Sequence, residues 1–274
     1  MKASKAIISS ILAIVSLVAA QFLSQLLTFL PIKNQALNAA VIIVGAFLYA
    51  GLTYFFIKII CEKYLHVSLP SIGVTKFSIN LVWGLSAFLL PVAVVAVFLL
   101  AGGSFNNRAA NVTDIIFNVF YGSLAAGFVE ELVFRGLILN VLAKKWNYWV
   151  GIFIPSLVFA SLHVIGRSLS FLSILQLLLA GTLVGIMFSL IELSCQSFWN
   201  DALVHAIWNL VTSAIILVST KPADDAMVTF VPKLKAFWFT GGDFGMESSV
   251  VAIEGYLLVS LVAWRMFKNK RSKN

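Results

Sequence analysis

Two adjacent carboxylates and an arginine interrupt a long apolar stretch of the chain. Glu130, Glu131 and Arg135 are the charged residues between Asp114 and Lys144. In a helix, Glu131 and Arg135 are four residues apart on one face, in the order that favours an ion pair. Glu130 points about 100° away from that face. The pattern predicts a working carboxylate, Glu130, beside a supporting ion pair. An ion-pair staple between two helices is the alternative.

Two other apolar stretches each carry a histidine that is about one helical turn away from a second candidate side chain. Phe159 and His163 are four residues apart, and so are His205 and Asn209. Each pair would therefore share one face of a helix. Taken singly, either pair could be a hydrogen-bonded packing contact between helices. Taken with the carboxylates, they favour a common site.

Together, the polar side chains of these stretches suit the hydrolysis of an amide bond. A carboxylate that apolar neighbours shield from water is a better proton acceptor, so Glu130 could take a proton from a water molecule. Histidine and asparagine side chains can donate hydrogen bonds to the oxyanion that forms. We expect the catalytic residues to be Glu130, His163, His205 and Asn209.

The elements that carry these residues are those of a membrane protein. Of the 274 residues, 61% are hydrophobic and 11% are charged, and the mean hydropathy is +0.99. Soluble domains are about half apolar and a quarter charged, so a soluble enzyme is excluded. Several uncharged stretches are long enough to cross a hydrocarbon core of about 30 Å. We expect an all-α, polytopic transmembrane helix bundle that forms one integral membrane domain over residues 1–274, surrounded by the lipid bilayer.

Hydropathy divides the chain into about eight spans, and the site should be buried among the fourth, fifth and seventh. The predicted spans cover residues 6–30, 38–60, 79–101, 113–143, 148–165, 170–191, 199–219 and 249–267. At 1.5 Å per residue, His163 would lie about 22 Å into its span from the inner face and His205 about 9 Å into its own. A shared site therefore requires tilted helices, a later start of the fifth span, or other boundaries.

The first span is interpreted as a membrane helix, with a signal peptide as the alternative. Its apolar run extends to Leu30, well beyond the roughly 7–15 residues of a signal-peptide core.

The lysine and arginine residues predict the orientation of the chain. The net charge is +8, but no basic stretch is long enough to bind nucleic acid. With the N-terminus inside, 12 cations lie in cytoplasmic segments and 6 lie outside, which favours cytoplasmic termini and an external loop at 220–248. The inside set is Lys2, Lys5, Lys58, Lys63, Lys76, Lys144, Lys145, Arg265, Lys268, Lys270, Arg271 and Lys273. The outside set is Lys33, Arg108, Arg167, Lys221, Lys233 and Lys235. The aromatic patch Phe237-Trp238-Phe239 of the external loop is expected to rest on the membrane surface.

In their order and context, the three motifs resemble those of the CPBP family. That family includes the type II CAAX prenyl endopeptidases and the bacterial Abi intramembrane proteases. The motifs in this chain are Glu130-Glu131-x-x-x-Arg135, Phe159-x-x-x-His163 and His205-x-x-x-Asn209. The resemblance covers residues 120–218, which we expect to be the catalytic core of an intramembrane endopeptidase.

The resemblance also implies a role for each matching residue. Glu130 is similar to the glutamate of the family that activates water. His163 and His205 would position the water and stabilise the oxyanion, and Asn209 would add a further donor. The supporting residues that it implies are Glu131 and Arg135 as a pair and Phe159 as a wall of the site.

No cofactor is expected for this chemistry, and a zinc ion is the alternative. The zincin signature His-Glu-x-x-His is absent from the sequence. Two histidines and one carboxylate from three helices could nevertheless bind Zn²⁺. A zinc-dependent intramembrane metalloprotease therefore stays open.

Two other classes of function compete with proteolysis. A transporter or proton channel could use Glu130, His163 and His205 as a proton relay, although no inverted repeat is detectable in the sequence. A non-catalytic membrane partner, such as a bacteriocin self-immunity protein, stays open. For a protease, we expect a membrane-bound protein or peptide as substrate. The small size and short loops indicate the plasma membrane of a bacterium.

Overall fold

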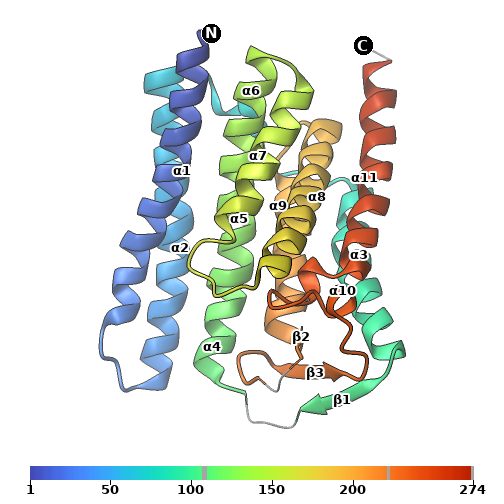
Figure 1. Ribbon diagram of the computed structural model, residues 1–274. Coiled ribbons are helices and arrows are strands. Elements are labelled where there is room, and N and C mark those ends of the chain that lie inside the picture. Colours follow the sequence, from blue (N-terminus) through green and yellow to red (C-terminus); the bar gives the residue numbers. More distant parts are fainter. Residues whose placement is uncertain (107–109, 221–222, 273–274) are drawn as a thin grey trace.

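The computed structural model describes residues 1–106, 110–220 and 223–272, and helices dominate it (Figure 1). Three charges of the orientation count, those of Arg108, Lys221 and Lys273, lie outside the described residues. The helices are α1 (Ala3–Gln25), α2 (Gln35–Ile59), α3 (Leu81–Leu100), α4 (Val112–Phe117), α5 (Ala126–Glu131), α6 (Asn140–Lys145), α7 (Tyr148–Leu162), α8 (Phe171–Cys195), α9 (Trp199–Asn209), α10 (Phe237–Thr240) and α11 (Val250–Arg271). The expected all-α polytopic bundle is confirmed.

Turns of 3-10 or π geometry extend several of these helices. Wide π turns continue α2 and α9 and also join α4, α5 and α6 into one rod. The 3-10 segments are η1 (Leu26–Phe29), η3 (Leu69–Ile72) and η7 (Met246–Ser248). The π segments are η2 (Ile60–Leu65), η4 (Asn118–Ala125), η5 (Leu132–Leu139) and η6 (Leu210–Ile215). The candidate carboxylates thus lie in a short α-helical stretch between two π segments, a geometry frequent at functional sites.

In the described part of the chain, six helical segments are long and apolar enough to cross a membrane. They are Ala3–Phe29, Gln35–Leu65, Leu81–Leu100, Val112–Lys145, Phe171–Cys195 and Val250–Arg271. The other two expected spans are shorter: α7 has 15 residues, and α9 has 11 before the six of η6. Helix α7 is therefore about 22 Å long, because the chain turns away after Leu162 through Gly166, whose φ is +77°.

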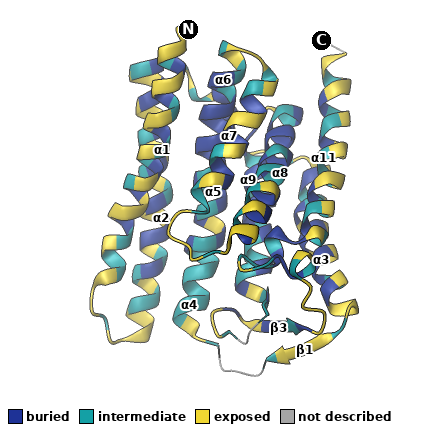
Figure 2. Cartoon of the chain, in the orientation of Figure 1, coloured by how far each residue is buried: buried dark blue, intermediate teal, exposed yellow. Residues whose placement is uncertain are grey.

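The outer surface of the bundle is apolar, as contact with lipid requires. Phe47 of α2, Phe88 of α3 and Leu258 of α11 are among many large apolar side chains that are exposed. Figure 2 shows exposed positions along the outward faces of α1, α2 and α11. Soluble monomers rarely expose apolar surface on this scale. Together with the long apolar helices, it makes the chain a multi-pass membrane protein.

The two ends of the bundle differ in structure. Both termini lie at one end, and a small sheet lies at the other (Figure 1). Its strands, β1 (Gly103–Asn106), β2 (Ile216–Val218) and β3 (Val228–Pro232), have the order β1-β3-β2. β1 pairs antiparallel and β2 parallel with β3. The sheet was not predicted, because strands this short fall below the length over which hydropathy or alternation is visible.

The aromatic patch at 237–239 is only partly on the surface. Trp238 is exposed, but the ring of Phe239 packs on that of Phe98 in α3, with the centroids 4.7 Å apart. Phe239 is partly buried by this contact, so α10 packs against the bundle beside α3. The contact of the patch with the membrane surface stays a prediction.

Two glycines allow the helices of the candidate site to approach one another closely. A Cβ on Gly127 of α5 would lie 2.6 Å from the backbone nitrogen of Ala206 in α9. A Cβ on Gly185 of α8 would lie 2.8 Å from the Cβ of Ser156 in α7. Small residues permit such contacts between membrane helices. The contacts hold α5 against α9 and α7 against α8.

Candidate active site

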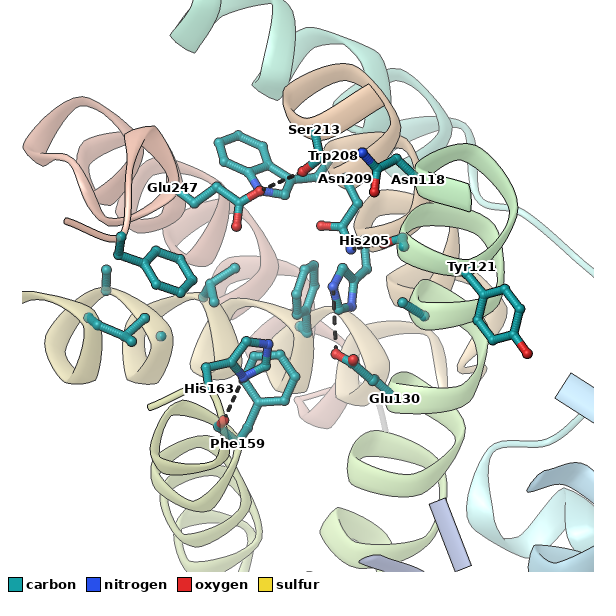
Figure 3. Close-up of a pocket in the computed structure, with 18 of the residues that line it drawn as sticks. Asn118, Tyr121, Glu130, Phe159, His163, His205, Trp208, Asn209, Ser213 and Glu247 are labelled. Atoms are coloured by element: carbon teal, nitrogen blue, oxygen red, sulfur yellow. Dashed lines mark hydrogen bonds and ion pairs between the residues drawn. The ribbon is translucent and has the colours of Figure 1, made fainter. Parts of the chain in front are cut away.

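The four side chains expected to be catalytic line one cavity of about 330 Å³ (Figure 3). Glu130 comes from α5, and His163 is the residue that follows α7. His205 and Asn209 come from α9. Phe159, which the family resemblance places in the wall of the site, also lines the cavity. The structure therefore brings together residues that are up to 79 positions apart, from Glu130 to Asn209.

The two histidines reach the same cavity because their helices begin at different depths. The connection between α8 and α9 lies deeper in the bundle than the connection between α6 and α7 (Figure 1). A few residues of α9 therefore bring the chain to the depth in the bundle that α7 reaches only at its C-terminal end. This difference in depth removes the conflict in the sequence-based topology.

Glu130 is the carboxylate that faces the cavity. Its side chain is 20% exposed. Its Oε2 lies 3.9 Å from Nε2 of His205 and has no hydrogen-bond partner among the described residues. This oxygen is buried yet unsatisfied by protein groups, an arrangement that calls for a partner from water or substrate.

Glu131 and Arg135 form the predicted ion pair beneath the cavity. Nη1 of Arg135 donates to Oε1 of Glu131 at 2.9 Å, and both side chains are fully buried. The guanidinium also donates to the carbonyl oxygen of Gly185 and lies over the ring of Phe159, 4.7 Å from its centroid. Neither Glu131 nor Arg135 lines the cavity. The two adjacent glutamates therefore have different environments.

His205 connects the two carboxylates, a contact that spacing along the sequence did not predict. Its Nδ1 lies 2.7 Å from Oε1 of Glu131, and its Nε2 faces Glu130. A carboxylate only accepts, so Nδ1 carries the proton in this bond. The ring also stacks on Phe188, with centroids 4.8 Å apart. Glu131 therefore fixes the orientation of the imidazole and leaves Nε2 for the cavity.

The other two candidate side chains, those of His163 and Asn209, are held by hydrogen bonds to backbone carbonyls. Nδ1 of His163 donates to the carbonyl oxygen of Phe159 at 2.8 Å, which leaves Nε2 for the cavity. Nδ2 of Asn209 donates to the carbonyl oxygen of Gly122 at 3.0 Å. An asparagine amide has two N–H groups. The second N–H of Asn209 is thus available to a ligand.

Sequence reasoning missed a carboxylate in this cavity. Glu247 of η7 lines it, and its Oε1 accepts from the hydroxyls of Thr212 at 3.0 Å and Ser213 at 3.3 Å. Glu247 lies in the segment after the last motif, where the sequence predicts an external loop. No local spacing links it to the helices that it contacts.

Two further buried carboxylates were missed although they carried a signal. Glu192 of α8 and Asp201 of α9 are 1% and 0% exposed. Neither lines the cavity, and both oxygens of Asp201 are without a hydrogen-bond partner among the described residues. A charge in an apolar segment is the same signal that identified Glu130.

The donor atoms at the site do not form a metal-ligand group. Within the described ranges, no three His, Cys, Asp or Glu side chains are grouped so that they could hold a metal ion. Nδ1 of His163 and Nδ1 of His205 are both engaged with protein oxygens. The Nε2 atoms that face the cavity suit hydrogen bonding to water or substrate.

Comparison with known proteins shows to which family the region of the site is similar. Residues 112–211 match the family model described as type II CAAX prenyl endopeptidase Rce1-like. No curated protein and no solved structure matches the chain. The matched stretch runs from α4 to η6, overlaps the expected core at 120–218 and contains all three motifs. Over this region the chain is similar to the Rce1-like type II CAAX prenyl endopeptidase family, which confirms the expected resemblance to the CPBP family.

Proposed function

We propose that this chain is an intramembrane endopeptidase in which Glu130 activates a water molecule. The family match supports a protease role. The observation that carries the glutamate mechanism is the contrast between the two carboxylates. Glu130 faces the cavity with an oxygen that has no hydrogen-bond partner in the described part of the chain, whereas Glu131 is buried beneath the cavity and paired with Arg135. A general base needs access to water, and a supporting residue does not.

The first step forms a tetrahedral intermediate. Glu130 removes a proton from the bound water as the water oxygen bonds to the substrate carbonyl carbon, and the carbonyl electron pair moves to its oxygen. The second N–H of Asn209 donates to this oxyanion. His205, held by Glu131 and protonated, donates from Nε2. Each such donor is worth about 10²- to 10³-fold in rate.

The second step breaks the peptide bond. The oxyanion re-forms the carbonyl as the bond from carbon to nitrogen breaks, and the protonated Glu130 delivers its proton to the departing amine. Since Nδ1–H of His163 is committed to the Phe159 carbonyl, the neutral ring presents a lone pair on Nε2. His163 therefore orients the water by accepting from it, and Phe159 forms the adjacent wall.

The substrate that suits this site is a membrane-bound protein or peptide. The cavity lies within a bundle whose outer surface faces lipid, and Gln21 and Gln25 of the first helical segment also line it. A substrate segment that reaches the site must therefore be associated with the membrane. Comparison of membrane proteomes with wild-type protein and Glu130→Ala would identify the substrate as a protein that accumulates uncut.

The test of the proposed mechanism compares isosteric changes at the adjacent glutamates. Glu130→Gln should abolish hydrolysis of membrane peptides by protein reconstituted in liposomes, with no loss of folded protein. Glu131→Gln keeps an acceptor for His205 but removes the counter-charge of Arg135, so it should lower the yield of folded protein and retain measurable activity per folded molecule. Full activity of Glu130→Gln with an inactive Glu131→Gln would reverse the two roles. Full activity of both variants would refute glutamate catalysis at this site.

A further inference from the structure

Glu247 is a charged group in the cavity that the proposed mechanism does not use. It lies outside the matched family region, on η7, immediately before α11. Figure 3 shows its carboxylate pointing into the cavity from the wall opposite Glu130. It therefore faces the space that a bound peptide would occupy on either side of the reacting carbonyl.

The protein holds this carboxylate in a fixed position. Its Oε1 accepts from Thr212 and Ser213 of η6. Its backbone carbonyl accepts from the hydroxyl of Tyr256 in α11 at 2.9 Å. Two bonds thus orient the half-buried side chain, and the third anchors its backbone. A group held in this way can select a ligand at little further cost in conformational entropy.

The second carboxylate oxygen of Glu247 is left without a counter-charge. No Lys, Arg or His side chain in the described ranges forms an ion pair with Glu247. Arg167, which also lines the cavity, is exposed and lies over the ring of Phe244, 4.7 Å from its centroid. A half-buried anion that lacks a counter-charge among the described residues favours a cation from the ligand.

We infer that Glu247 selects substrates that place a basic group, the side chain of lysine or arginine, beside the scissile bond. This inference rests on the proposed peptidase function and adds a substrate class to it. The ammonium or guanidinium would donate to the free oxygen, Oε2, while Oε1 keeps its bonds to the two hydroxyls. A free amino terminus offers the same chemistry and is a second possible source of the cation.

The test uses matched quenched-fluorescent peptides, each with one apolar span, and protein reconstituted in liposomes. In one series a lysine or a glutamine occupies each position near the cleavage site in turn, and the peptides are N-acetylated. A second pair contains no lysine and differs only in having a free or an acetylated amino terminus. The variants are Glu247→Gln, which retains an acceptor for Thr212 and Ser213, and the control Glu254→Gln. Glu254 is an exposed acid of α11 that does not line the cavity.

We expect wild type and Glu254→Gln to prefer lysine over glutamine at one position by about 10- to 100-fold in kcat/KM, as for a hydrogen bond to a charged group. Glu247→Gln should lose this preference and cleave the lysine and glutamine peptides at similar rates. A preference only between free and acetylated termini, lost in Glu247→Gln, would assign the subsite to the amino terminus and overturn the side-chain assignment. Equal loss of cleavage of all peptides in Glu247→Gln, or no preference in wild type, would overturn the inference and leave the peptidase function intact. Failure of wild type to cleave any peptide would contradict the peptidase function itself.

Discussion

Replacing Arg135 by leucine should destabilise the fold far more than replacing Glu130 by glutamine. Arg135→Leu leaves Glu131 charged and fully buried, with only His205 as a partner. Removing one member of a buried ion pair costs about 3–5 kcal/mol. The carbonyl of Gly185 keeps a partner, because the hydroxyl of Ser189 also donates to it. The loss should therefore arise mainly at Glu131.

The measurement is reversible unfolding in detergent, together with the abundance of folded protein in membranes. A cost of 3 kcal/mol corresponds to more than about 100-fold in the unfolding equilibrium constant. Glu130→Gln should change stability by less than about 1 kcal/mol, because the side chain is partly exposed and its Oε2 has no hydrogen bond to lose. The double variant Arg135→Leu/Glu131→Gln removes the uncompensated charge and should recover part of the loss. The reasoning is refuted if Arg135→Leu is as stable as Glu130→Gln, or if the double variant is less stable than Arg135→Leu.

Three other outcomes are expected. Hydrolysis should survive exhaustive chelation of metal ions, with the metal content measured on the same sample. If chelation abolishes activity, and stoichiometric Zn²⁺ restores it in wild type but not in His163→Ala, the protein is a metalloprotease instead. After replacement of the native cysteines by serine, a cysteine at Ser272 should react with an impermeant reagent only from the cytoplasmic side, and one at Lys235 only from outside. Labelling of both from one side would contradict the predicted topology. Gly127→Ala should reduce activity and stability, since its Cβ would lie 2.6 Å from the nitrogen of Ala206; a variant as stable and active as wild type would mean that α5 and α9 can separate without consequence.

The long helices and the ion pair could be predicted because both depend on local order in the chain. Uncharged runs of helical length mark most of the spans, and Glu131 and Arg135 pair because four residues make about one turn of helix. The error in span length at α7 has a local cause as well. Apolar residues continue to Ile165, but the helix ends at Leu162, so hydropathy overestimates its length.

The acids Glu192 and Asp201 show a second reason why prediction from the sequence was incomplete. Both are visible in the sequence as acids within or beside apolar segments. Spacing does not separate them from candidate site residues, since Asp201 is four residues before His205 on the same helix. Burial, which only the packed bundle reveals, is what distinguishes them from acids at a membrane surface.

Residue types and helical spacing alone established a membrane bundle, three polar motifs and a difference between Glu130 and Glu131. Tertiary packing decided which of those residues meet. Because α9 begins deep in the bundle and lies against Gly127, His205 reaches both carboxylates although it is 74 residues from Glu131. Packing also brought Glu247 into the same cavity from a segment without a motif. The spacing of residues along one helix indicates the direction in which each side chain points. Contacts between helices depend on the depth and tilt of each helix and on how closely the helices approach one another, and no local sequence pattern encodes these properties.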